Sequence, residues 1–222
     1  MTLRACAMLL AAALAGAPPA AAQGAPPAVV VLTFENGGSY GMDSLDFSGL
    51  ARAIPATLTA DLALNPGLRA VPYAQGRAAL PQGGRVDATT AARVGKQLGA
   101  SEVVTGTFVD YYGRVRIDAR LIDAANGAIL EVVSTGQRAR AELPQMVADI
   151  SAQLMSGKRL PALPSGTAGT APLSTEALVL FGRGVLAQEQ GDAAAAADYY
   201  QRALKVAPNF TAAKEGLASV RS

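Results

Sequence analysis

The fold is decided by residues 114–127, which have the sequence RVRIDARLIDAANG. Polar and apolar residues alternate up to Leu121, and a period of two is typical of a strand with one wet and one buried face. Asn126-Gly127 is a dipeptide that favours a tight hairpin turn. We therefore expect residues 129–134 to return beside this strand as its antiparallel neighbour.

The stretch before this strand predicts a third, adjacent strand. Residues 98–107 have the sequence LGASEVVTGT, and residues 102–109 are rich in β-branched side chains. Tyr111-Tyr112-Gly113 separates them from Arg114 and is best explained as a turn. Three consecutive strands joined by short turns predict an antiparallel meander.

The amino-terminal half predicts a buried strand, a helix and an edge strand. Residues 28–34, AVVVLTF, form the continuous apolar run of a strand buried on both faces. Apolar residues then recur at three- and four-residue spacing over residues 46–64, which predicts a helix. Pro55 predicts either a kink there or a helix that begins at Pro55. Residues 68–72 end in proline and predict a short edge strand.

Two further helices complete the expected α/β domain, residues 28–156. Asp87 or Thr89 can cap a helix that ends before Gly99, and helical spacing returns over residues 143–154. The pattern predicts an α/β (α+β) sandwich with a mixed sheet and an antiparallel meander.

A different kind of unit follows a segment rich in Pro, Gly, Ser and Thr. We interpret residues 157–173 as a linker and residues 174–222 as a small all-α helical hairpin with a capping helix. Spacings across residues 177–210 match a tetratricopeptide repeat, a helix-turn-helix of about 34 residues. The matching positions are Leu180, Gly184, Gly191-Asp192, Ala196, Tyr200, Ala203 and Pro208.

The first helix of this repeat supplies a candidate binding groove. In longer arrays its exposed face lines the concave surface, and a single repeat can instead pack that face on the rest of the chain. The candidate groove residues are Leu178, Phe181, Val185, Gln188 and Glu189.

The first residues predict export. Arg4 precedes a short apolar run, and Ala20-Ala21-Ala22 supplies a cleavage pattern, so residues 1–22 are expected to be a signal peptide. Cys6, the single cysteine, lies within it; residues 3–6 resemble a lipidation motif, but no apolar region precedes them. The expected location is the periplasm, with association with the outer membrane as an option, and no transmembrane segment is expected in the mature chain.

Composition excludes several classes of function. The chain has 222 residues, 19 Lys+Arg against 17 Asp+Glu, a net charge of +2, one cysteine and no histidine. Without histidine there is no imidazole base or imidazole metal ligand. The scattered basic residues argue against nucleic-acid binding. We therefore expect no enzyme, no catalytic residue, no metal site and no cofactor.

Surface residues with two interpretations remain. Glu35, Asp43 and Asp46 lie around a Gly-rich loop; they are helix caps, ligands of a cation, or the carboxylates of a glycosidase. Tyr111 and Tyr112 form a turn, or a candidate binding loop with exposed aromatic rings. Arg114, Arg116, Asp118 and Arg120 form a charged stripe on one sheet face, which is either a solvated face or a partner surface.

The helix-to-strand step LGA-x-x-VVTG and the hairpin LIDAANG resemble the periplasmic α/β module shared by CsgG-type secretion proteins, LpoB-type activators of penicillin-binding proteins and the TolB amino-terminal domain. The resemblance covers residues 29–154. It implies action by protein–protein contact in the cell envelope and no catalytic centre within the module. No lipidated cysteine and no extra barrel-forming strands follow the signal, so a secretion pore is not expected.

The sequence thus predicts an exported, non-enzymatic envelope adaptor or assembly accessory. Its partners are expected to be envelope proteins or further copies of itself. The alternatives are a regulator of a peptidoglycan synthase, as LpoB-type proteins are, and a carboxylate-dependent envelope glycosidase.

Overall fold

The computed structural model describes residues 25–41, 44–81, 85–156, 158–165 and 173–221. The expected signal peptide with Cys6, and the candidate carboxylate Asp43, lie outside the described residues.

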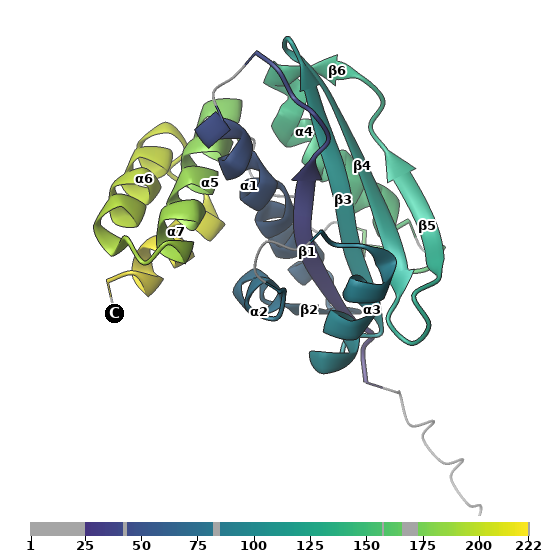
Figure 1. Ribbon diagram of the computed structural model, residues 1–222. Coiled ribbons are helices and arrows are strands. Elements are labelled where there is room, and N and C mark those ends of the chain that lie inside the picture. The colour runs from purple at the N-terminus through teal and green to yellow at the C-terminus, as the bar shows by residue number, and fades with distance from the viewer. Residues whose placement is uncertain (1–24, 42–43, 82–84, 157, 166–172, 222) are drawn as a thin grey trace, which may run out of the picture.

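One mixed sheet forms the centre of the molecule (Figure 1). Its order is β2-β1-β3-β4-β5, and β6 pairs with β4. β1 runs parallel to β2 and β3, whereas β3, β4 and β5 are antiparallel, so the predicted mixed sheet and meander are confirmed. The strands are β1 (Ala28–Asn36), β2 (Arg69–Val71), β3 (Glu102–Tyr111), β4 (Arg114–Asp123), β5 (Ile129–Ser134) and β6 (Arg138–Ala139).

The alternation of polar and apolar residues that predicted β4 matches the exposed and buried faces of this strand. Val115, Ile117, Ala119 and Leu121 are buried under helices, and the charged residues between them lie on the opposite face. The apolar side chains of the sheet form two clusters, one on each side. The burial of the first cluster fixes the register of β4, because a shift by one residue would bury the arginines.

Helices α1 (Ser44–Ala63) and α4 (Leu143–Leu154) cover the first face, and α3 (Ala88–Gln97) covers part of the other. α1 runs through Pro55, so the alternative in which the helix begins at Pro55 is wrong. Proline removes one backbone hydrogen bond. Burial of the apolar face of α1, including Leu50, Ile54 and Leu58, outweighs that cost.

The capping residues in the sequence predict the bounds of α3 correctly, but no sequence feature predicts α2. Asp87 caps α3 and accepts a hydrogen bond from Thr90 N at 2.8 Å, and Gly99 has a φ of +62° just after the helix. The short helix α2 (Tyr73–Ala78) was not predicted from the sequence. It fits against β1 because a Cβ on Gly76 would lie 2.8 Å from Val30.

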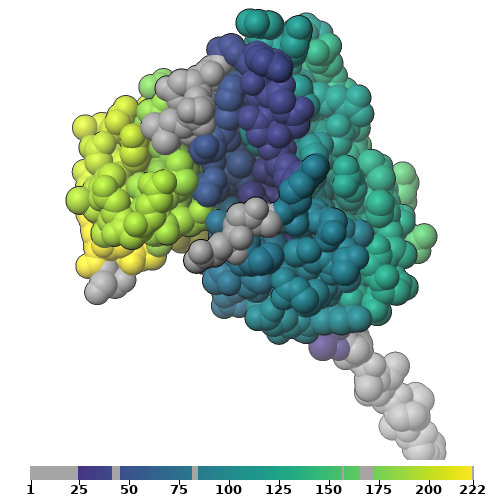
Figure 2. All heavy atoms as spheres, in the orientation of Figure 1, coloured from purple at the N-terminus to yellow at the C-terminus, as the bar shows by residue number. Residues whose placement is uncertain are grey.

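The carboxy-terminal helices are α5 (Thr175–Glu189), α6 (Ala193–Val206) and α7 (Thr211–Ser219), and they pack together as predicted. Of these helices, α5 lies directly against α1, as Figure 2 shows. Two glycines meet at this contact, since a Cβ on Gly182 of α5 would lie 2.2 Å from Gly49 O of α1. Before α5, Leu160 is buried in the same apolar cluster as α1 and α5. The cluster is therefore continuous across the expected domain boundary.

Candidate functional site

Three exposed tyrosines gather at the turn that joins β3 to β4. This turn lies at one end of the sheet, at the top of Figure 1. Tyr111 is the last residue of β3, and Tyr112 follows it in the turn. Tyr40 comes from the loop after β1, where it forms a parallel bridge with Tyr111. The residues are 56%, 72% and 56% exposed for Tyr111, Tyr112 and Tyr40. Their ring centroids lie 5.1 to 6.3 Å apart. We call these three residues the tyrosine tip.

The tyrosine tip rests on a buried ion pair. Asp110 has no exposed surface, forms an ion pair with Arg140 and accepts a hydrogen bond from Gly113 N at 2.8 Å. Ser39 Oγ accepts a bond from Asp110 N at 2.9 Å, and Tyr40 N donates to Asp110 O at 2.7 Å. One residue thus holds both the turn and the loop that carry the aromatic rings.

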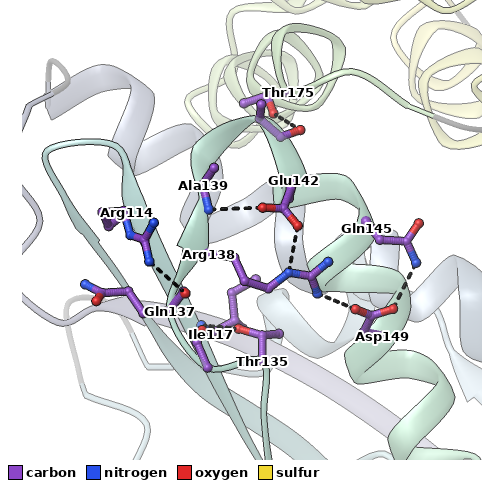
Figure 3. Close-up of polar contacts among 12 residues, drawn as sticks. Arg114, Ile117, Thr135, Gln137, Arg138, Ala139, Glu142, Gln145, Asp149 and Thr175 are labelled. Carbon is purple, nitrogen blue, oxygen red and sulfur yellow. Dashed lines mark hydrogen bonds and ion pairs between the residues drawn. The ribbon is translucent and has the colours of Figure 1, made fainter.

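A second polar network holds the neighbouring end of the sheet to the helices (Figure 3). Arg138 on β6 donates to Glu142 at 3.0 Å and pairs with Asp149 on α4, to which Gln145 donates at 2.9 Å. Burial raises the pKa of Asp149, but the bonds from Gln145 and Arg138 outweigh it and lower that pKa. Arg114, opposite Tyr111, donates to Gln137 O at 3.3 Å.

Tyr112 has a backbone conformation that its side chain does not favour. Its φ is +50°, and it is the single non-glycine residue with positive φ in the described part of the chain. Gly113 follows with a φ of +88°, so the turn has positive φ at both central positions, where Asn and Gly are usual. A bulky residue there is strained, and such strain is often kept at functional sites.

A cavity of about 730 Å³ lies between the carboxy-terminal helices and α1, β2 and α2. Four of the five candidate groove residues line it: Phe181, Val185, Gln188 and Glu189. Leu178 does not; it is fully buried in the main apolar cluster. The helix face singled out from the sequence therefore packs partly on α1 and partly faces this cavity.

The polar groove residues hold the helices together. Gln188 Oε1 accepts from Tyr200 OH at 2.7 Å, and its Nε2 donates to Ser219 Oγ at 3.1 Å, which connects α5, α6 and α7. Glu189 lies between two arginines, 2.7 Å from Arg52 Nε and 3.5 Å from Arg77 Nε. Phe181 is 3% exposed and packs against Tyr200 and Phe210.

The structure places Glu35 in β1 and Asp46 in α1, and it gives both carboxylates structural partners. Glu35 accepts a hydrogen bond from Val86 N at 3.0 Å, and Asp46 pairs with Arg183 on α5. On the open sheet face, Arg116 pairs with Asp118 at 2.9 Å. Among the described residues, no group of three or more His, Cys, Asp or Glu side chains is placed to hold a metal ion.

Sequence reasoning did not single out Tyr40, Tyr73 or Arg77. Tyr40 joins the tyrosine tip through its bridge with Tyr111, which is distant in the sequence, so no local sequence pattern could predict the contact. Tyr73 and Arg77 belong to α2 and line the cavity. Burial, followed by the carboxylate of Glu189, raises the pKa of Tyr73 to about 12.

No family model and no curated protein matches this sequence. Solved structures with similarity include the LpoB carboxy-terminal domain from Escherichia coli, with 18% identity, 49% of this chain and 80% of that chain covered, and a TM-score of 0.40. The PelC dodecamer from Paraburkholderia phytofirmans has 17% identity and a TM-score of 0.37, and the match covers 61% of this chain and 88% of that chain. Lipoprotein GNA1162 from Neisseria meningitidis has 20% identity and a TM-score of 0.37, and the match covers 58% of this chain and 96% of that chain.

The described chain is thus an α/β protein with a six-stranded mixed sheet and three packed carboxy-terminal helices. It has structural similarity to LpoB, PelC and lipoprotein GNA1162, at a level that carries no information about activity or partners. Within the described ranges, no helix combines the length and apolar character needed to cross a membrane.

Proposed function

We propose that this protein is an exported, non-enzymatic adaptor of the cell envelope that binds another envelope protein through the tyrosine tip. The observation that carries the proposal is the cluster of Tyr40, Tyr111 and Tyr112, each more than half exposed and in mutual ring contact. Tyrosine is enriched at protein interfaces because its ring offers a large apolar area with little conformational freedom to lose.

The base of the tyrosine tip supports the same proposal. The Asp110–Arg140 pair and the bonds from Gly113 and Tyr40 fix the loop and the turn before any partner arrives. A surface that is already ordered loses little entropy on binding. Asn would adopt this positive φ with less strain than Tyr112, and a tyrosine in a strained turn is consistent with a binding role.

We further propose that α5–α7 form a tetratricopeptide-like unit within this periplasmic adaptor. Gly184 lies so close to Tyr200 that a Cβ would approach the ring to 2.6 Å, and Ala196 and Ala203 are fully buried. Small residues at these places are those that the repeat pattern requires. The unit packs on α1, which supports a bracing role.

The variant Tyr112→Asn tests the adaptor proposal. Asn adopts positive φ readily, so we expect the free energy of unfolding to rise by about 0.5–1 kcal/mol or to stay unchanged. Capture of partners from an envelope extract on the immobilised protein, read by quantitative mass spectrometry, is expected to fall at least tenfold. Val132→Thr, at an exposed apolar residue on β5, serves as the matched control and should leave capture unchanged.

Size-exclusion chromatography of both variants distinguishes the kind of partner. Loss of a self-associated species in Tyr112→Asn alone would identify a second copy as the partner. Equal capture of every protein by the wild type and by Tyr112→Asn would refute a binding role for the tyrosine tip.

A further inference from the structure

The open face of the sheet carries an excess of positive charge beside the tyrosine tip. Arg114, Arg116, Asp118 and Arg120 alternate with buried residues along β4, so their side chains share this face. We call these four residues the arginine stripe. The stripe has three arginines against one aspartate, whereas the whole chain has 19 basic and 17 acidic residues. The imbalance is therefore a local property of this face.

The arginine stripe does not neutralise its own charge. Arg116 pairs with Asp118 at 2.9 Å, and Arg114 donates to a neutral acceptor, the carbonyl oxygen of Gln137, at 3.3 Å. Arg120 is exposed, and within the described ranges its side chain forms no ion pair or hydrogen bond. Two of the three guanidinium groups are thus left without a carboxylate.

The strands on either side of β4 do not supply the missing negative charge. On β3, Val109 lies opposite Arg116 and Thr105 lies opposite Arg120. On β5, Val132 lies opposite Arg120. Residues directly opposite each other share a face of the sheet, so cross-strand ion pairs would have to form at these positions. The uncharged neighbours leave the positive charge available to a partner.

One further carboxylate on this face already has a cation. Glu35 on β1 lies beside Thr107 of β3 and therefore on the open face, but its carboxylate is 3.3 Å from Arg85. It also accepts the hydrogen bond from Val86 N. Glu35 therefore does not offset the charge of the stripe.

The stripe is continuous with the tyrosine tip. Tyr111 lies directly opposite Arg114, so the two side chains share the open face. Asp110, the acidic residue beneath the tip, has no exposed surface and is paired with Arg140. The surface from the tip to Arg120 thus combines exposed aromatic rings with uncompensated positive charge.

We propose that the partner of the tyrosine tip is a protein with an acidic, extended segment that lies along the arginine stripe; this inference rests on the proposed adaptor function. Side chains on one face of a strand recur roughly every 6.6 Å. An extended segment with acidic residues at alternate positions presents its carboxylates with the same period. Arginine binds a carboxylate through two parallel hydrogen bonds, and opposite charges speed the encounter.

A titration with a defined acidic peptide tests the proposal. The probe is an acetylated decapeptide of alternating Glu and Ser, and its control is a decapeptide of alternating Lys and Ser. Nuclear magnetic resonance of the labelled full chain follows the binding. The acidic peptide should shift the amide signals of residues 111–120, and the basic peptide should not. Its affinity should fall at least about threefold between about 50 and 300 mM NaCl, because salt screens exposed charges.

Charge variants locate the binding and establish its sign. Arg120→Gln should weaken binding of the acidic peptide about two- to fivefold, as expected for one exposed ion pair. Asp118→Asn removes the carboxylate of the stripe and should strengthen binding by a similar factor, which a variant that only disturbs the fold would not do. Arg202→Gln, on α6, makes the same change of charge away from the sheet and should leave binding unchanged.

Equal binding of the two peptides, full binding by Arg120→Gln, or unchanged binding by Asp118→Asn would each overturn the proposal. Tighter binding of polygalacturonate than of the acidic peptide would overturn it in favour of an anionic polysaccharide. Capture from an envelope extract that is lost in Tyr112→Asn but complete in Arg120→Gln would overturn the acidic partner while leaving the adaptor function intact.

Discussion

At Gly182 and Gly49, one missing carbon atom decides how closely α5 approaches α1. A Cβ on Gly182 would lie 2.2 Å from Gly49 O and 2.6 Å from Gly49 C, and the Cβ of Ala53 would lie 3.0 Å away. The backbone oxygen cannot turn aside as a flexible side chain could. The two helices can therefore meet at this distance only with glycine at position 182.

We expect Gly182→Ala to lower the free energy of unfolding by about 1–3 kcal/mol, because the added methyl group must push α5 away from α1. In an uncrowded helix the same change would be stabilising by about 1 kcal/mol. The sign of the change in a urea titration therefore decides whether the contact exists. A midpoint equal to or above that of the wild type would contradict it.

Acid should weaken the amino-terminal cap of α3, because protonation of the Asp87 carboxylate weakens its hydrogen bond from Thr90 N. The backbone bond from Thr90 is the largest cause of a lowered pKa at Asp87. A lowered pKa in the folded state means that the contribution is complete above the unfolded pKa of about 3.9 and is lost as the pH falls through the lower folded value.

Asp87→Asn retains a good capping residue without a titratable group. We therefore expect its melting temperature to fall less than that of the wild type between pH 5 and pH 2.5, as followed by circular dichroism. Parallel falls in both proteins would show that Asp87 does not contribute to acid sensitivity.

At the scale of elements, the Asp110–Arg140 ion pair should contribute more to the free energy of unfolding than the ion pairs of Arg138. Removal of Arg140 leaves Asp110 buried without its cation, whereas the pairs of Arg138 are partly exposed. We expect Arg140→Ala to lower the free energy of unfolding by about 3 kcal/mol and Arg138→Ala to lower it by much less.

Denaturant titration of these two variants makes the comparison, and proton exchange of the Tyr112 and Gly113 amides should quicken in Arg140→Ala alone. Equal losses of stability, or unchanged exchange at the turn in Arg140→Ala, would show that the pair does not hold the tip.

Elements with a strong local pattern could be predicted from the sequence, and those defined by distant contacts could not. The alternation in β4 and the cap at Asp87 are local, so both were found. α2 has six residues and contains Gly76, so its helical state depends on packing against β1. Asp110 and Arg140 are 30 residues apart, and no spacing rule connects them.

At the scale of the whole molecule, one apolar cluster includes side chains from the sheet, α1, α4 and the carboxy-terminal helices. The cavity is assembled from α1, β2, α2, α5, α6 and α7, so its existence could not be predicted from any single segment. Four of its wall residues could be predicted from the sequence because they match the groove face of the first helix in the repeat pattern.

A shared cluster predicts cooperative unfolding. We expect far-ultraviolet circular dichroism and tyrosine fluorescence to give the same thermal midpoint, because loss of the α1–α5 contact exposes both units. Phe210→Ala, in the carboxy-terminal helices, should lower that common midpoint, with a loss of about 3–5 kcal/mol for a buried phenylalanine.

Two separate transitions in the wild type, or a shift of only one probe in Phe210→Ala, would show instead that the helical unit unfolds independently of the sheet.

The contact between α1 and α5 also constrains the order of assembly. Arg52 cannot pair with Glu189, nor Asp46 with Arg183, until the second residue of each pair has been made, 137 residues further along the chain. Contacts of such high sequence separation slow folding, and the uncovered apolar face of α1 is prone to aggregation meanwhile. During synthesis, α1 is therefore made long before α5 is available to cover it, and a chaperone that shields apolar helices should have its greatest effect there.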